Sequence, residues 1–235
     1  MFELVPGAGG GAGYTETVLH AFAGGSVDGS GPTGRLLLDS HGHLYGTTRN
    51  GASGLGAGCV FELSPAAGGA YQETLLHAFA GTTAQDGANP WAGLVMDGAG
   101  DLYGTTDQGG TYGMGAVFEL SPAGGGGYAE AILHSFAGGS GDGAHPLSTL
   151  WLDTAGSLYG TTLGGGSAGN GGTVFRLDPA GAGGSVETLL HAFTGSAGDG
   201  LAPQAGVIMD SQGNLYGTAA QGGGTANDGV IWRID

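Results

Sequence analysis

The chain has 235 residues, and its 20 acidic residues against 4 lysines and arginines give a formal net charge of −16 at pH 7. Neutralising phosphates needs clustered cations, so this charge excludes an electrostatic nucleic-acid binder, and an anionic membrane surface would repel the chain for the same reason. Although 57 residues are glycine, hydrophobic residues make up 40% of the sequence and recur at fixed offsets, so we expect a folded chain.

Cysteine usage and hydropathy exclude two further classes of protein. The one cysteine, Cys59, allows no internal disulfide, and its replacement by Ala, Thr and Val in the other repeats indicates a small packing residue rather than a nucleophile. No apolar run approaches the roughly 20 residues of a membrane-spanning helix, so we expect no membrane insertion. The opening MFELVPGAGG lacks the basic and apolar regions of a signal peptide, so we expect the export signal to be absent from this chain.

The chain opens on two strand-like segments, Phe2 to Leu4 and Glu16 to Phe22, and the second of these ends in the word LHAF. This word returns three times, once as LHSF, and its histidine recurs at steps of 57 residues. The four histidines are His20, His77, His134 and His191. Self-similarity at such a period is typical of a solenoid or a propeller.

Each period contains four strand-like segments in a constant order. The first, such as LLLD, is almost continuously apolar, which suits a strand buried on both faces. An Asp-x-x-Gly turn leads into LYGTT, whose glycine marks a place where neighbouring backbone approaches closely. CVFELSP and ETLLHAF are the third and fourth segments. Because four antiparallel strands make a propeller blade, the sequence predicts an all-β fold, a β-propeller with four blades of four antiparallel strands.

We interpret residues 1–235 as a single propeller domain whose closing blade is built from both termini. In the last repeat no fourth strand follows the first and second strands, Val207 to Asp210 and Leu215 to Ala219. The segment Glu16 to Phe22 can supply this fourth strand and hide both sheet edges. The repeats span approximately residues 34–80, 92–137, 148–194 and 205–235, the last completed by 1–23.

This count leaves one surplus copy of the third strand of a blade, because two segments compete for the same position. They are Met1 to Val5 and Val230 to Asp235. The C-terminal copy is longer and is tethered by its own hairpin, so we expect it to occupy the slot. A self-closed monomer is the favoured arrangement. The alternatives are an excerpt of a longer repeat array and a strand-exchanged dimer that closes a larger ring.

The words DxxGxLYGTT, GxVFxLxP, LHxFxG and DGxxPxxG together resemble the GloVer repeat, a bacterial propeller-type repeat of large secreted or surface proteins. The resemblance covers essentially the whole chain. It implies a propeller fold, a secreted or cell-surface location, and an export signal and C-terminal anchoring domains that this chain does not contain. It implies no established activity and no catalytic residues.

Four aspartates form the most regular candidate site, each in an Asp-Gly pair four residues before a proline. They are Asp28, Asp86, Asp142 and Asp199. They fall in the connections from a fourth strand to the next first strand, which share a face with the loops between second and third strands. Four carboxylates near the axis could hold a hard cation such as calcium, and apart from this possible calcium we expect no cofactor. The alternative interpretation is an ordinary turn in which Asp bonds backbone two residues ahead.

The four LHxF histidines are also candidates for metal ligands. A period of 57 residues places them on outer strands of different blades, so they cannot share one metal. We expect them to pack between blades and to donate to a backbone carbonyl. The phenylalanines two residues later should form a core between blades.

Residues that break the repeat are the candidates for ligand binding, since repeated residues encode the scaffold. Aromatic rings beside amide, carboxylate and guanidinium groups suit a sugar-binding surface, because rings stack on the pyranose face and polar groups bond its hydroxyls. Unselected loop variation explains the same pattern. The candidates are Trp91, Asn89, His145, Arg49, Tyr112, Asp107 and Asn170.

Three functions remain, and we rank a non-catalytic extracytoplasmic scaffold that presents Gly-rich loops to a protein or glycan partner first. A carbohydrate-binding propeller is second. A calcium-dependent or metal-assisted lyase or hydrolase is third, because no GxSxG, HExxH or Ser/His/Asp grouping stands in a suitable context and no catalytic residue can be named.

Overall fold

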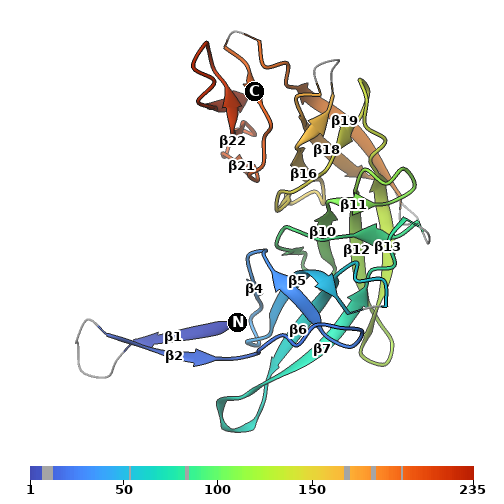
Figure 1. Ribbon diagram of the computed structural model, residues 1–235, viewed down its shortest axis with the longest axis vertical. Helices are drawn as coiled ribbons and strands as arrows, with labels where there is room; N and C mark the ends of the chain where they lie inside the picture. Colours follow the sequence, from blue (N-terminus) through green and yellow to red (C-terminus); the bar gives the residue numbers. More distant parts are fainter. Residues whose placement is uncertain (7–12, 53, 83–84, 167–169, 181–183, 197) are drawn as a thin grey trace.

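The computed structural model describes residues 1–6, 13–52, 54–82, 85–166, 170–180, 184–196 and 198–235. Its strands form the antiparallel sheets of a four-bladed β-propeller, which confirms the predicted fold class, and the blades follow one another along an arc from β4 to β24 (Figure 1). The described residues contain no α-helix, and Ala67–Gly69 form the 3-10 turn η1.

Three blades have four strands each, as the repeat predicts. The first contains β4 (Leu37–Leu38), β5 (Leu44–Gly51), β6 (Cys59–Pro65) and β7 (Tyr71–Ala78). The second contains β9 (Val95–Met96), β10 (Leu102–Thr106), β12 (Ala116–Ala123) and β13 (Gly127–Ser135). The third contains β15 (Trp151–Leu152), β16 (Leu158–Thr162), β18 (Thr173–Pro179) and β19 (Ser185–Ala192). The fourth contains β21 (Ile208–Met209), β22 (Leu215–Ala219) and β24 (Val230–Ile234).

Short ladders pair the segment that enters each blade with the segment that follows its LYGT strand. In the first blade β3 (Gly29–Pro32) pairs with the end of β5. In the later blades the pairs are β8 (Gly87–Ala88) with β11 (Gln108–Gly109), β14 (Gly143–Ala144) with β17 (Gly164–Gly165), and β20 (Gly200–Leu201) with β23 (Gln221–Gly222). The predicted common face of these two sets of loops is therefore confirmed.

The glycine of LYGTT makes room for an aromatic ring, not for backbone. Gly46 lies opposite Phe61 in the ladder between β5 and β6. A Cβ on Gly46 would come within 2.6 Å of the Phe61 Cζ and 2.9 Å of a Leu36 methyl group. The equivalent glycines of the other blades face Phe118, Phe175 and Trp232 in the same way. The expectation of a close backbone approach is wrong, because the ring of the adjacent third strand fills that space.

The core lies between blades, as predicted from the phenylalanines of LHxF. Phe79, which follows the fourth strand of the first blade, packs edge-on against Phe118 of the second blade at 5.1 Å between ring centroids. Both rings are fully buried. The same edge contact joins Phe136 to Phe175. Each junction thus buries two large rings, which contributes several kcal/mol per junction at about 1.5 to 3 kcal/mol per side chain.

The first strand of each blade is shorter and more exposed than predicted. β4, β9, β15 and β21 have two residues each. Leu38 and Ile208 are 64% and 61% exposed, whereas Leu94 and Leu150, which each lie one residue before the strand, are buried. The apolar run therefore places one residue in the core between blades and the next residues on a half-exposed edge, so burial on both faces is wrong.

The Asp-x-x-Gly turns have the predicted geometry. Asp39 Oδ1 accepts hydrogen bonds from the backbone N–H groups of His41 and His43, both at 2.8 Å. Gly42 takes a φ of +87°, which a residue with a Cβ rarely adopts. The other blades repeat this bonding at Asp97, Asp153 and Asp210.

Closure of the fourth blade by the N-terminus is not found in this structure. β1 (Phe2–Pro6) pairs with β2 (Tyr14–Val18) as a separate hairpin, and β24 pairs with β22. No described strand pairs with the other edge of β24. The two third strands therefore do not compete for one slot, because each pairs with its own neighbour along the chain.

Candidate functional site

The junction loops hold the first group of predicted site residues. Arg49 lies near the end of β5, and its guanidinium carbon lies 4.4 Å from the centroid of the Trp91 ring in the next repeat. Asn89 Nδ2 donates to the Arg49 carbonyl at 3.0 Å. Arg49 Nε is buried without a hydrogen-bond partner, and Trp91 remains 37% exposed. The structure thus brings three of the predicted residues together in one stacked group.

The next junction around the propeller has different chemistry. His145 Nδ1 lies 3.1 Å from Asp107 Oδ1 and 3.0 Å from the Asp107 carbonyl oxygen. The imidazole is 38% exposed and the carboxylate 17% exposed. In the repeat, His145 is equivalent to Asn89, and Asp107 is equivalent to Arg49. The predicted residues therefore form two separate groups at successive junctions.

A shared backbone arrangement presents these different side chains. Asn89, His145 and Ala202 have left-handed φ values of 55°, 58° and 57°. Each of these residues donates its backbone N–H to a carbonyl oxygen of the preceding loop, namely that of Ala57, Met114 and Gly171 in turn. Its own carbonyl oxygen accepts the N–H of a residue that follows the LYGT strand of its blade, namely Asp107, Leu163 and Ala220 in turn. The backbone is therefore constant while the side chain changes from amide to imidazole to methyl.

The last two predicted residues lie elsewhere on these loops. Asn170 Oδ1 accepts the backbone N–H of Gly165, and Asn227 bonds Gly222 in the same way one repeat later. Asn170 thus has an equivalent in the next repeat and stabilises its loop. Tyr112 is 60% exposed in the loop between β11 and β12. A hollow of about 300 Å³ is lined by Asn89 together with residues that include Leu55, Thr82 and Gln108, and neither Asn170 nor Tyr112 lines it.

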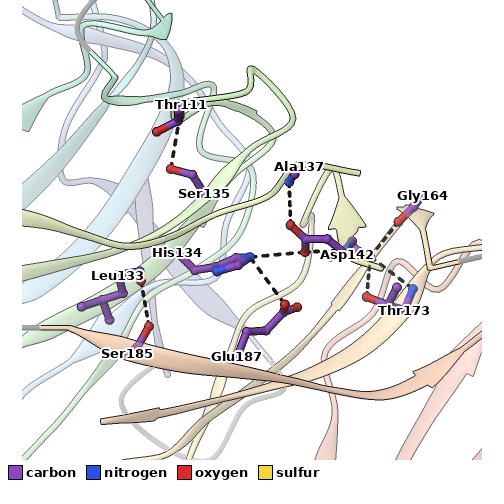
Figure 2. A network of polar contacts seen from close by, with 12 residues as sticks. Thr111, Leu133, His134, Ser135, Ala137, Asp142, Gly164, Thr173, Ser185 and Glu187 are labelled. Carbon is purple, nitrogen blue, oxygen red and sulfur yellow. Dashed lines mark hydrogen bonds and ion pairs between the residues drawn. The ribbon is translucent and has the colours of Figure 1, made fainter. Parts of the chain in front are cut away.

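The four predicted aspartates lie beside the LHxF histidines. His134 Nε2 lies 3.3 Å from Asp142 Oδ1 and 3.8 Å from Glu187 Oε2, which comes from the fourth strand of the next blade (Figure 2). The expectation that the ring donates to a backbone carbonyl is wrong, because the carboxylates of two elements meet it instead. Two further clusters repeat this arrangement, His20 with Asp28 and Glu73, and His77 with Asp86 and Glu130.

Backbone donors hold each aspartate in place. Asp142 accepts N–H groups from Ala137 and Gly143, both at 2.6 Å (Figure 2). Burial opposes ionisation, but the hydrogen bonds from His134 and these N–H groups outweigh it and lower the pKa of Asp142 below its usual range. Burial, followed by the charge of Asp142, raises the pKa of Glu187 to about 7. One carboxyl of the cluster is therefore held ionised while the other favours its protonated form.

Sequence reasoning missed the glutamates of these clusters. Glu73, Glu130 and Glu187 stand 53 residues after the histidine they approach. A signal was present, because glutamate stands four residues before the histidine in all four LHxF segments. A β-bulge lies between that glutamate and its own histidine, because the register shifts where Leu75 pairs with Phe61 and His77 pairs with Val60. The two side chains therefore lie on opposite faces of the strand, and each histidine meets the glutamate of the following blade.

A metal ion could be held by three of these clusters. In each, one imidazole nitrogen and two carboxylate oxygens lie within 4.8 Å of one another. Calcium prefers six to eight oxygen ligands, whereas one imidazole and two carboxylates suit Zn²⁺ or Mn²⁺. Each of the four aspartates lies beside the LHxF histidine of its own junction between blades. Calcium binding by Asp28, Asp86, Asp142 and Asp199 stays a prediction.

One comparison with known proteins identifies a relationship. The family model described as the Gloeobacter/Verrucomicrobia repeat matches residues 1–232. No curated protein matches the chain. In the described part of the chain, no helix is long and apolar enough to cross a membrane.

Proposed function

The chain belongs to the Gloeobacter/Verrucomicrobia repeat family, and we propose that it is a non-catalytic scaffold that presents its junction loops to a partner outside the cytoplasm. One observation carries this proposal. Successive junctions keep the same backbone hydrogen bonds while the side chain changes from Asn89 to His145 to Ala202. A constant frame with variable side chains is how rigid scaffolds position binding loops.

Site-specific photo-crosslinking in the producing cell tests this role. A photoreactive residue in place of Tyr112, on the loop face, should give a discrete adduct. The matched control replaces Val186, which is similarly exposed at 58% but lies on β19, away from the loop face. Equal labelling from Tyr112 and Val186, or none from Tyr112, would contradict a binding role for the loops. Fractionation of the same cells tests the extracytoplasmic location, which the acidic charge of −16 and the family support.

Carbohydrate is the partner class that the first junction favours. Trp91 is partly exposed and stacks on Arg49, which gives an aromatic face with a charged donor beside it. Asn89 lines the hollow of about 300 Å³. Stacked rings beside amide donors suit a pyranose. On a glycan array, the wild-type chain should bind a defined set of sugars, Trp91→Ala should lose them, and Tyr14→Ala should retain them.

Cation binding is a separate candidate, supported by the donor atoms of the His–Asp–Glu clusters. A cation that binds only the folded chain raises its melting temperature by mass action. We expect zinc or manganese to raise Tm, EDTA to reverse the rise, and Asp142→Asn to reduce it more than the exposed control Asp228→Asn. A Tm that neither cation nor EDTA changes would exclude this role.

A further inference from the structure

The two ends of the chain carry complementary parts of a blade. The hairpin of β1 and β2 has the register of a third and a fourth strand, since Leu4 faces Glu16 as Leu63 faces Glu73 in the first blade. In the described residues this hairpin has no first or second strand beside it, and β24 has no fourth strand beside it. Each end therefore lacks what the other supplies.

The apolar positions at both ends are exposed, although the same positions are buried inside the propeller. Ile231 of β24 is 84% exposed, whereas its equivalents Val60, Val117 and Val174 are fully buried. Phe2 and Leu4 of β1 are 58% and 51% exposed, whereas Phe61 and Leu63 are fully buried. Burying apolar side chains is favourable, so these positions suit contact with a further blade, as their equivalents show.

The polar cluster at the last junction is incomplete in the same sense. His191 Nε2 lies 3.1 Å from Asp199 Oδ1, as in the interior clusters. The His191 side chain is 40% exposed, whereas the interior His77 and His134 are each 20% exposed because a glutamate of the next blade approaches them. Glu16 stands four residues before its LHxF histidine, as the interior glutamates do, and is exposed on β2.

A groove lies where the missing fourth strand would pack. Its volume is about 340 Å³, and β24 forms one wall. His191, Phe193 and Asp199 line it together with Trp232. The groove therefore lies beside the open edge of β24 and beside the pair of His191 and Asp199.

We propose that β24 of one copy of this chain pairs with β2 of a second copy, in place of that copy's β1. The register of the interior blades sets Trp232 opposite Val18, Arg233 opposite Thr17, and Ile234 opposite Glu16. Glu16 of the second copy then completes the cluster of His191 and Asp199.

A second copy fits better than closure within one chain. Within one chain the hairpin and the fourth blade lie at opposite ends of the arc, whereas the fourth blade of one copy can meet the hairpin of another (Figure 1). Strand addition to an open edge gains main-chain hydrogen bonds and hides the edge from other partners. Because the two surfaces differ, the contact is head-to-tail, and it generates a ring where the rotation closes or a filament where it does not.

Mixed disulfide trapping tests this contact with the full chain. One preparation carries Thr17→Cys and the other carries Arg233→Cys, both at exposed positions of the isolated chain. Mixing them under mild oxidation should give a covalent dimer that contains one chain of each kind. Thr74→Cys is the matched control, since it occupies the same strand position on β7, where β6 already pairs. It should give no dimer with Arg233→Cys.

Two outcomes would overturn the proposal. The first is that the double variant Thr17→Cys/Arg233→Cys forms an internal disulfide while the two single variants give no mixed dimer, which would mean that the ring closes within one chain. Absence of both products would mean that β24 and β2 do not pair. The dissociation constant of the head-to-tail contact, from light scattering, should rise about tenfold in Glu16→Ala, because the side chain that completes the cluster is lost. Glu3→Ala on the same hairpin should leave it unchanged.

Discussion

The junction between the first and second blades and the outer face of the fourth blade carry equivalent residues in different surroundings. Val60 is fully buried at the first of these places, and its equivalent Ile231 is 84% exposed at the second. His77 meets the carboxylates of both Asp86 and Glu130, whereas among the described residues Asp199 is the one carboxylate that meets His191. The difference teaches that a blade of this protein is completed by its neighbour, so an interface and an interior junction are built from the same residues.

The largest expected effect is the loss of an interior ring. Phe118→Ala removes a fully buried side chain that packs against Phe79, and the cavity should cost about 3 to 5 kcal/mol in the free energy of unfolding. Phe2→Ala, at an exposed equivalent position on β1, should cost within about 0.5 kcal/mol. Urea denaturation of both variants measures the contrast. Similar losses would mean that the N-terminal hairpin is as well packed as an interior blade.

Removing an aspartate of a complete cluster should have the next largest effect. Asp142→Ala leaves two backbone N–H groups and His134 without their carboxylate acceptor, at a cost of about 2 kcal/mol. The same change at Asp199 should cost about half as much, since that cluster is more exposed.

The pH dependence checks the origin of this loss. The folded pKa of Asp142 is lowered, so its stabilisation is present above its ordinary pKa of 3.8 and is lost as the pH falls through the lower folded value. The difference in unfolding free energy between wild type and Asp142→Ala should therefore shrink under acid. A difference that persists to the lowest pH at which the chain folds would assign the loss to packing.

Glu130→Gln should have a smaller effect with the opposite pH dependence. Burial, followed by the hydrogen bond with Asp86, raises the pKa of Glu130 from its ordinary 4.5 to about 7. Its protonated form contributes stability that is complete below 4.5 and is lost as the pH rises to about 7. At pH 8 Glu130→Gln should therefore be more stable than wild type by about 1 kcal/mol, and at pH 4 the two should agree. The exposed control Glu3→Gln should show no such pH dependence in thermal unfolding.

The smallest expected effect concerns the variable junctions. Arg49→Gln removes the stack on Trp91 and should lower the unfolding free energy by about 0.5 to 1 kcal/mol, because the ring is partly exposed. Chemical denaturation of Arg49→Gln beside Arg35→Gln measures it. A loss as large as that of Asp142→Ala would make Arg49 part of the scaffold rather than of a presented surface.

Much of the fold and part of the site could be predicted from residues that recur. The LHxF phenylalanines indicated a core between blades, and Phe79 and Phe136 form it. Arg49, Asn89 and Trp91 do not recur, and although they were predicted to lie on one loop face, the structure was needed to group these three apart from His145 and Asp107. The partners of the histidines could not be found from spacing within one repeat, because each histidine meets a glutamate 53 residues away, on another blade.

The sequence by itself determined the strand content and order of a blade, because alternating apolar positions and Asp-x-x-Gly turns are local features that each repeat spells in full. Only the tertiary structure decided which strands pair at the chain ends and which side chains meet across a junction. β2 pairs with β1 because closing a short hairpin costs less conformational entropy than joining two ends separated by nearly the whole chain. The contacts across a junction depend on how one blade is placed against the next, and no single repeat contains that information.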